Sequence, residues 1–194
     1  MKSISFIQPS RNNLKYLKWS YESIRKNLDP RHEICWADDF SDDGTWEWMQ
    51  EIVKKDPNVR IHRNEGPTRL GHTILYDTLV NDYATKDIVM IYHADMYACP
   101  GLDEYILKHL EPGKVVSATR IEPPLHPDGP EKIIQDFGIE PEEFDERGLL
   151  EFVMDYNSKN HDRPTKGIFA PWAIYKKDFQ EINGHDPLYA PQSK

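Results

Sequence analysis

Apolar and polar residues alternate along the first part of the chain in blocks that predict strands and helices in turn. Short apolar runs favour buried strands, and the longer segments between them carry apolar residues at helical steps of three and four. The predicted strands are 4–7, 34–37, 59–62, 88–92 and 115–118, and the helical patterns run over 14–28, 46–53, 70–79 and 102–110. This alternation predicts an α/β fold with a mostly parallel central sheet and helices on both faces.

The pattern changes after Thr119. Residues 120–166 are rich in Pro, Glu and Asp and hold only fragments of helical pattern, at 131–136 and 148–155. Because this segment has too few apolar residues for a core of its own, we expect a long excursion from the sheet, of the kind that often forms a lid or binding loop. Apolar residues return at 168–175, before a short helix at 177–182. We therefore expect one domain over residues 1–194.

Composition narrows the classes of partner. The 194 residues carry 24 Lys and Arg against 33 Asp and Glu, a net charge of −9, which argues against a nucleic-acid-binding protein. No apolar run approaches the roughly 20 residues of a membrane helix, and the N-terminus lacks a signal-peptide pattern. The two cysteines, Cys35 and Cys99, have neither metal-site nor disulfide-framework spacing. We expect a cytoplasmic protein, and peripheral association with a membrane is compatible with the same pattern.

Two acidic clusters follow predicted strands, where open α/β sheets bind their ligands. The first runs from Asp38 to Thr45 (DDFSDDGT), and the second is His93-Ala94-Asp95. Asp38 and Asp39 are adjacent, so one carboxylate can hold the loop while the other faces a ligand. Capping of the next helix is the simpler interpretation of Asp42 and Asp43, and a weaker alternative for Asp38 and Asp39.

The second cluster has a pattern suited to a divalent cation. A single carboxylate at the edge of a sheet can bind Mg²⁺ or Mn²⁺ together with substrate phosphates, and an imidazole two residues away can join it. A His-x-Asp alone is a weak signal, and its position after a buried strand is what strengthens it. Arg11 and Arg69 fall in loops on the same edge, where they either contact the ligand or are simply solvated. Gly66 permits a close backbone approach or only a turn.

At these residues the chain resembles the family 2 glycosyltransferases, which have the GT-A fold. The resemblance covers residues 3–119 and about 167–189. Five segments match family motifs in the same order: 4–12 the first strand and its turn, 38–45 the Asp-Asp-x-Ser motif, 64–66 the Asn-x-Gly loop, 93–95 the Asp-x-Asp motif, and 182–186 a degenerate Gly-Gly-Phe-Asp segment.

The resemblance implies a glycosyltransferase that moves a sugar from a nucleotide-diphosphate sugar, typically of the UDP type, to a hydroxyl acceptor with inversion. Residues 1–119 would bind the donor and 167–194 would face the acceptor. Asp39 would accept from the base and Asp38 would support the loop. Asp95 would bind Mn²⁺ or Mg²⁺, with His93 as a further ligand. The remaining donor-binding residues implied by the resemblance are Pro9, Arg11, Gly66, Arg69 and Ala94.

The chain also departs from the family pattern. His93 stands in place of the first Asp of Asp-x-Asp and brings no negative charge to a cation. Arg11 replaces an aromatic residue, and the expected Arg falls at Gly71, which leaves Arg69 as its substitute. The catalytic carboxylate usually follows the Gly-Gly-Phe-Asp segment, so we expect Asp186 to be the base or the base to lie beyond Lys194 in a longer polypeptide. A donor-binding module without turnover and a sugar nucleotidylyltransferase are the alternatives.

Overall fold

The computed structural model describes residues 2–125, 129, 132–160 and 167–190, and its centre is a six-stranded sheet. The strands lie in the order β3-β2-β1-β4-β8-β5. β1 pairs in parallel with β2 and β4, and β2 with β3, whereas β8 runs antiparallel to both β4 and β5. The strands span β1 Ile4–Ser10, β2 Glu33–Asp39, β3 Val59–Asn64, β4 Ile88–Ile91, β5 Val116–Ser117 and β8 Trp172–Tyr175.

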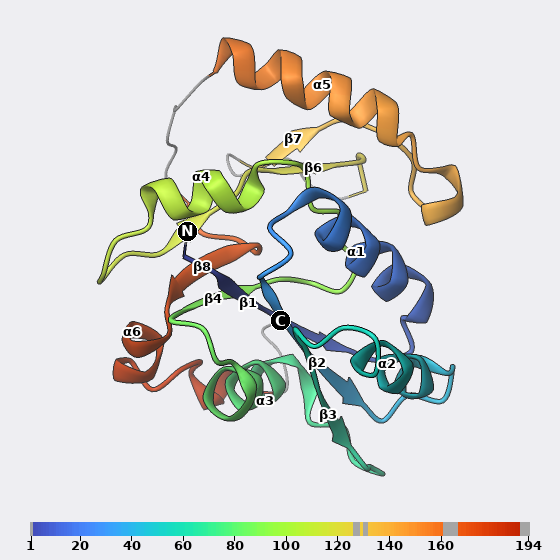
Figure 1. Cartoon of the computed structure of the whole chain (residues 1–194), viewed down its shortest axis with the longest axis vertical. Coiled ribbons are helices and arrows are strands. Elements are labelled where there is room, and N and C mark those ends of the chain that lie inside the picture. Colours follow the sequence, from blue (N-terminus) through green and yellow to red (C-terminus); the bar gives the residue numbers. More distant parts are fainter. Residues whose placement is uncertain (1, 126–128, 130–131, 161–166, 191–194) are drawn as a thin grey trace.

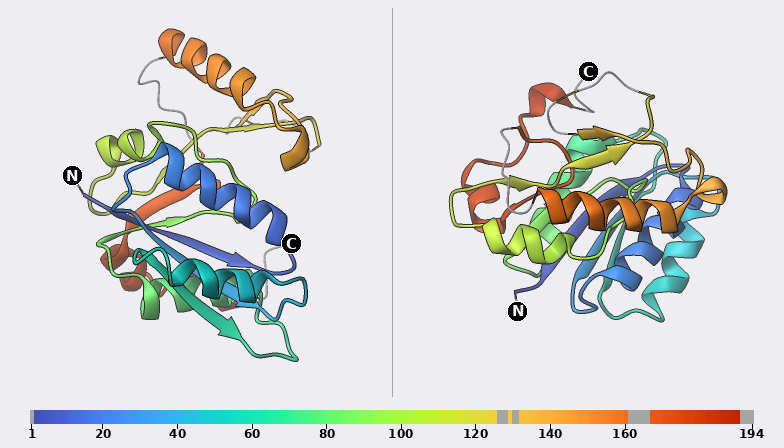
Figure 2. Two further views of the ribbon diagram at one scale, coloured as in Figure 1. Left: turned by 45° about the vertical axis from the view of Figure 1, so that its right-hand side comes forward. Right: turned by 90° about the horizontal axis from the view of Figure 1, so that it is seen from above.

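Helices cover both faces of this sheet (Figures 1 and 2). Leu17 of α1, Met49 of α2 and Ile106 of α4 pack against one face, and Leu75 of α3 and Phe179 of α6 pack against the other. The helices span α1 Leu14–Asn27, α2 Thr45–Val53, α3 Gly71–Thr78 with the π-helical turn η1 Leu79–Tyr83, α4 Leu102–His109 and α6 Lys176–Glu181. The predicted α/β/α architecture with a mostly parallel sheet is therefore confirmed.

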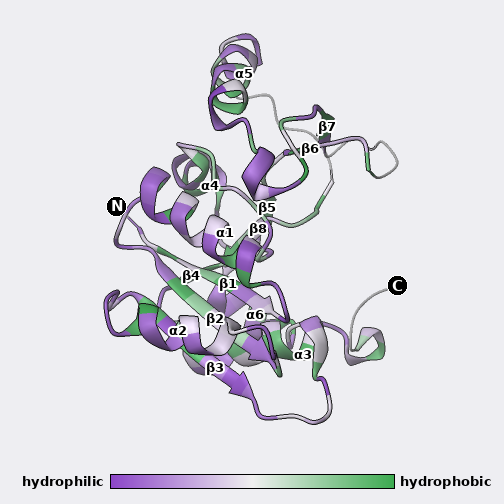
Figure 3. Ribbon diagram, turned by 90° about the vertical axis from the view of Figure 1, so that its right-hand side faces the viewer, coloured by the Kyte–Doolittle hydropathy of each residue, from purple (hydrophilic) through white to green (hydrophobic). Residues whose placement is uncertain are grey.

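Burial explains the apolar runs of the inner strands. In β4, Ile88 and Met90 face the α1 side while Val89 and Ile91 face the α3 side, and all four are buried. A parallel strand covered on both faces has no need of polar positions. The edge strand β3 is only half-covered and mostly polar, a contrast that the hydropathy colours of Figure 3 show.

The excursion after β5 has regular structure of its own. β6 (Arg120–Glu122) and β7 (Lys132–Ile134) form a small parallel sheet, followed by the 3₁₀ turn η2 (Pro141–Glu143) and α5 (Glu146–Lys159). α5 lies beyond the layer of α1 and α4 in Figures 1 to 3. The helix fragment predicted at 131–136 is wrong: Lys132, Ile133 and Ile134 pair with β6, and two adjacent isoleucines favour a strand. The fragment predicted at 148–155 is the middle of α5.

None of the helices in the described part of the chain is both long and apolar enough to cross a lipid bilayer.

Candidate functional site

Three polar residues form a row across the carboxyl ends of β1, β2 and β3. Ser10, Asp38 and Arg63 occupy in-register positions on these neighbouring strands, so their side chains leave the sheet toward the same face. The Arg63 Nε lies 3.6 Å from Asp38 Oδ2. Asp38 and Asp39, the first two of the four acidic residues in the first cluster, lie within β2, because the strand extends to Asp39 rather than ending at residue 37 as predicted.

Several polar atoms of this row and of the adjacent Arg11 are buried without a hydrogen-bond partner. They are Ser10 Oγ, Arg11 Nε, Asp38 Oδ1 and Arg63 Nε. Buried polar groups in folded proteins nearly always have a partner, whether protein, water or ligand. Four unsatisfied atoms at one edge of a sheet therefore indicate a place built to receive a polar molecule.

The environment of Asp38 disfavours its charge. Burial raises the pKa of this carboxyl, and the hydrogen bonds from Ser41 and the charge of Arg63 only partly oppose the shift, so the pKa lies above its ordinary value. The backbone N–H of Ser41 donates to Asp38 Oδ2 at 3.3 Å. Only Oδ1 therefore remains as an acceptor without a partner.

Asp39 points to the opposite side of the sheet, and its carboxylate accepts three hydrogen bonds. Its Oδ1 accepts from Asn64 Nδ2 at 2.7 Å and from the N–H of Leu70 at 3.0 Å, and its Oδ2 accepts from the N–H of Gly71 at 3.0 Å. Burial acts to raise the pKa of Asp39, but these hydrogen bonds outweigh it and the pKa falls below its ordinary value. Asp39 thus joins β2 to the beginning of α3.

Of the next two acidic residues, Asp42 and Asp43, only Asp43 satisfies backbone N–H groups at helix starts. Asp43 Oδ2 accepts from the N–H of Leu14 at 3.1 Å and Oδ1 from the N–H of Thr45 at 3.0 Å, so one carboxylate satisfies the first residues of α1 and α2. The capping interpretation is therefore confirmed for Asp43. Asp42 is exposed and donates only its backbone N–H, to Asn12 Oδ1 at 3.0 Å.

The loop between β3 and α3 folds closely over these ends. Gly66 has a φ of +72° and precedes a cis peptide bond to Pro67. A Cβ at Gly66 would lie 2.4 Å from the ring of Phe40, which explains why glycine stands there. Arg69 follows with a half-exposed side chain whose Nε lies 3.7 Å from Asp39 Oδ2.

The second cluster continues directly from β4. Gln8 of β1, itself completely buried, donates from Nε2 to the carbonyl of His93 at 3.2 Å. The same group donates to Ser20, and Gln8 Oε1 accepts from Trp36 Nε1 at 3.0 Å, so the amide is fixed on both sides. Gln8 thereby positions the turn that presents the exposed residues His93 and Asp95, with Ala94 buried between them.

A second imidazole, His72 of α3, lies within electrostatic reach of this turn, and the sequence did not single it out. The pKa of His72 is lowered by burial and by the charge of Arg69, while Asp95 and Asp39 oppose the shift, which places His72 within electrostatic reach of both carboxylates. Although His93 as a residue is exposed, desolvation by the surrounding protein lowers the pKa of its imidazole, with Asp95 opposing and His72 contributing. Both imidazoles are therefore neutral at physiological pH.

A family model described as Glycosyl transferase family 2 matches residues 5–173. The chain belongs to this family. The predicted family, a family of glycosyltransferases, is confirmed. A search of curated protein sequences gave no significant match.

Solved structures of glycosyltransferases share the fold of this family 2 chain. GalNAc-T7 with UDP, GalNAc and Mn²⁺ has a TM-score of 0.68 at 15% identity, covering 97% of this chain and 38% of that one. Residues 1–349 of TarS from S. aureus give 0.62 at 15% identity, covering 93% and 49%. The mannosyltransferase PcManGT from Pyrobaculum calidifontis, in complex with GDP-Man and Mn²⁺, gives 0.53 at 22% identity, covering 61% and 36%. The chain spans less than half of each of these structures.

The residues that the family resemblance singled out occupy distinct parts of this edge. Buried Pro9 pairs with Ala37, and half-buried Arg11 begins the loop after β1. Asp186 lies just before the 3₁₀ turn η3 (Pro187–Tyr189): it is exposed and its Oδ1 accepts from the N–H of Leu188 at 2.9 Å. The preceding residue, His185, is held by Asp77 of α3, with Nδ1 2.6 Å from Oδ1. The structure adds Ser10, Arg63 and His72 to the candidate site residues that the sequence predicted.

The ligand set near Asp95 suits Mn²⁺ only in part. Carboxylate and imidazole are ligands that Mn²⁺ accepts. Within the described residues, however, no three His, Cys, Asp or Glu side chains form a ready cage. A cation held by Asp95 and an imidazole would therefore need oxygen ligands from the substrate, the arrangement typical of metals that bind with phosphates.

Proposed function

We propose that this chain binds a nucleotide-diphosphate sugar, of the UDP type, across the carboxyl ends of β1–β4 and takes part in transfer of its sugar to a hydroxyl acceptor. The observation that carries the proposal is the group of unpartnered polar atoms at Ser10, Arg11, Asp38 and Arg63. A nucleotide offers N–H and hydroxyl groups to the oxygens of Ser10 and Asp38, and carbonyl, hydroxyl or phosphate oxygens to the Nε–H groups of Arg11 and Arg63. The neighbouring structures that contain UDP or GDP-Man support a nucleotide in this fold.

The hydrogen bonds favour an assignment of roles different from the one that the family resemblance implies. Asp39 already accepts three hydrogen bonds that hold α3, whereas Asp38 retains an oxygen without a partner. We therefore assign base recognition to Asp38 and the support of the loop to Asp39. Pro9 would shape the floor of the nucleotide site, and Arg11 and Arg69 would approach the base or the diphosphate.

Asp95 is proposed to hold the divalent cation, with His93 as a second ligand and the diphosphate completing the shell. When bound, such a cation neutralises charge that develops on the leaving diphosphate. The chain itself fixes the position of the Asp95 carboxylate, because the hydrogen bond from Gln8 to the His93 carbonyl holds the turn that carries it. The imidazoles of His72 and His93 are neutral, so Asp95 supplies the negative charge for the cation.

In the transfer, a carboxylate base would deprotonate the attacking hydroxyl on the face opposite the leaving group, which gives inversion. Asp186 is the proposed base within this chain. One of its oxygens is already used at Leu188, so the proton would go to Oδ2.

Thermal-shift measurements with UDP-, GDP- and dTDP-sugars, each with and without Mn²⁺, test the donor assignment. A ligand that binds only the folded chain raises the unfolding midpoint by mass action. We expect the largest shift from a UDP-sugar with Mn²⁺. The absence of any shift from all three nucleotide classes at millimolar concentration contradicts the proposal.

A further inference from the structure

A cavity of about 480 Å³ lies beside Asp95, between the end of β4, α1 and the 120–166 excursion. Its volume falls in the range of roughly 300–1,000 Å³ of small-molecule sites. Aromatic side chains form much of its wall: Tyr16, Trp19, Tyr92, Tyr97, Phe137 and Phe144. The nucleotide part of the proposed donor site lies over β1–β3, whereas this cavity extends toward residues flanking β5 and β8, Ala118 and Pro171. Asp95 therefore stands between the two.

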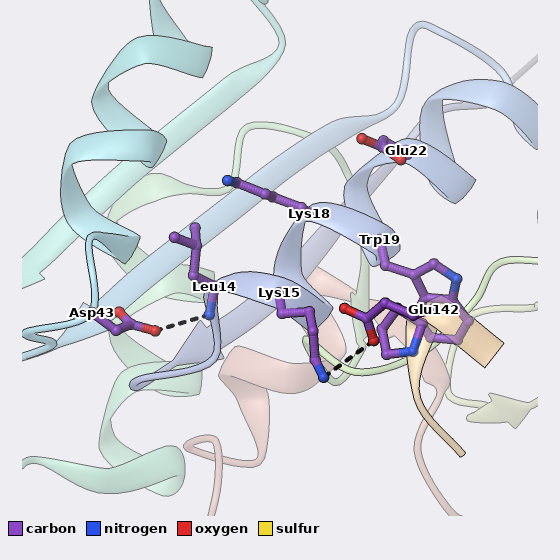
Figure 4. Close-up of a pocket in the computed structure, with 8 residues that line it drawn as sticks. Leu14, Lys15, Lys18, Trp19, Glu22, Asp43 and Glu142 are labelled. Carbon is purple, nitrogen blue, oxygen red and sulfur yellow. Dashed lines mark hydrogen bonds and ion pairs between the residues drawn. The ribbon is translucent and has the colours of Figure 1, made fainter. Parts of the chain in front are cut away.

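Glu140 and Glu146, in the segment that follows β5, hold this segment over the cavity through polar contacts with α1 and the turn after β4. Glu140 accepts from Tyr16 at 2.7 Å and pairs with Lys15, and Glu146 pairs with Lys26 at 2.7 Å and accepts from Tyr97. Figure 4 shows a further contact between α1 and this segment, the ion pair of Lys15 with Glu142 beside Trp19. These contacts hold Tyr16 and Tyr97 in the wall of the cavity, where Trp19 and Phe144 also pack against Tyr97.

One hydroxyl in the wall lacks a partner. Tyr16 and Tyr97 donate their hydroxyl groups to Glu140 and Glu146, but the Tyr92 hydroxyl has no hydrogen bond although the residue is only 1% exposed. Tyr92 lines the cavity, and its hydroxyl lies within electrostatic reach of Cys99, Asp95 and Tyr97, three other lining residues. A buried hydroxyl without a partner is the kind of group that a ligand satisfies.

The charge of the wall disfavours an anion. Its charged side chains are the carboxylates of Asp95, Glu122 and Glu140 and the guanidinium of Arg120. Arg120 and Lys132 both pair with Glu122, and Lys15 pairs with Glu140, so among the described residues Asp95 is the carboxylate of the wall without an ion pair. An anionic group beside Asp95 would be repelled by this carboxylate, while the one cation among the described wall residues, Arg120, already pairs with Glu122.

We propose that this cavity receives the acceptor, and that the acceptor presents a neutral saccharide ring. The proposal rests on the proposed function, because it takes the donor to lie on the far side of Asp95. Aromatic faces suit the apolar side of a sugar ring, the Tyr92 hydroxyl offers a hydrogen bond to a ring hydroxyl, and Asp95 marks the end of the cavity at which the two substrates meet.

Protection of Cys99 from alkylation tests the proposal without requiring turnover. Cys99 lines the cavity, and burial raises the pKa of its thiol to about 11, so iodoacetamide reacts slowly at pH 9. Cys35 is completely buried in β2 and serves as the internal control. The probes are the p-nitrophenyl glycosides of glucose, galactose and mannose, compared with glucose 1-phosphate and with UDP, and mass spectrometry follows each thiol.

We expect at least one neutral glycoside to slow the alkylation of Cys99, by about tenfold at ten times its Kd, while glucose 1-phosphate and UDP do not. Tyr92→Phe should raise that Kd about three- to tenfold, since it removes one hydrogen bond. Tyr83→Phe, which removes a hydroxyl bonded to His62 elsewhere, should leave it unchanged. Equal protection by UDP, equal protection by glucose 1-phosphate, or no protection by any glycoside overturns the proposal. Cys99 protection without any nucleotide-dependent thermal shift contradicts only the proposed donor site.

Discussion

The carboxylate of Asp39 at the end of β2 accepts a hydrogen bond of 3.0 Å from the backbone N–H of Gly71, the first residue of α3. The first N–H groups of a helix have no acceptor within the helix, so Asp39 supplies the acceptor for a buried N–H that would otherwise lack one. Since α3 also carries His72, this contact sets where that imidazole lies relative to Asp95.

Asp39→Ala is expected to destabilise the fold by about 3 kcal/mol, because it removes hydrogen bonds to a charged acceptor and leaves two backbone N–H groups unsatisfied. Urea unfolding at pH 7 measures the change. The contribution of Asp39 to stability should also fall as the pH is lowered, since its pKa in the folded chain is below the ordinary value and protonation removes the advantage. A loss below 1 kcal/mol contradicts this role.

Asp38→Asn should have the opposite effect on stability. The folded-state pKa of Asp38 is raised, so the folded chain binds its proton more tightly than the unfolded chain does. The contribution of Asp38 to stability therefore decreases as the pH rises from the ordinary Asp pKa through the folded-state pKa. We expect the variant to unfold at a higher temperature than the parent at pH 7, with the difference vanishing below about pH 4.

The same variant should bind the donor nucleotide about tenfold more weakly, because a charged acceptor is replaced by a neutral one. Calorimetry with UDP provides the measurement. A variant that is both more stable and unchanged in affinity would show that Asp38 is not a binding residue.

His93→Asp tests the departure from Asp-x-Asp. A second carboxylate adds negative charge beside Asp95, so Mn²⁺ should bind about tenfold more tightly in the presence of UDP. His93→Asn keeps the position neutral and serves as the control, for which we expect no gain. Equal Mn²⁺ affinity in the parent and the Asp variant would place the cation away from residue 93.

Gly66→Ala should destabilise the chain through two effects that a matched variant separates. Positive φ costs a residue with a side chain about 1–2 kcal/mol, and at Gly66 the added Cβ also meets the Phe40 ring at 2.4 Å. Gly113 has a similar φ of +75° but open space around its Cβ position, so Gly113→Ala reports the backbone strain alone. Equal losses in the two variants would mean that Phe40 moves aside freely.

Most of the central sheet could be predicted from the sequence because its strands are continuous apolar runs, as in Ile88–Ile91. The ends of those strands were harder to place. Asp38 and Asp39 belong to β2, but polar residues at a strand end have the same pattern as a loop. β7 was missed because a run of three residues, Lys132–Ile134, is too short for any period to be decisive.

The candidate site shows a similar limit. Motif order brought Asp38, Asp39 and Asp95 to one edge of the sheet. His72 gave no local signal, since it lies on α3 and comes within electrostatic reach of Asp95 only through the packing of that helix against the sheet. The row of Ser10, Asp38 and Arg63 depends on the register of three strands. That register depends on how the strands pair in the folded chain, and it cannot be predicted from the pattern of one sequence.

The most direct measurement is calorimetry of UDP-sugar binding with and without Mn²⁺, comparing the parent chain with Asp95→Ala. Asp95 is exposed beyond β4, so its replacement should leave the thermal midpoint within about 2 °C of the parent. We predict that Mn²⁺ strengthens binding to the parent at least tenfold and has no effect on binding to Asp95→Ala. Mn²⁺-dependent binding that is equal in both proteins would contradict the account.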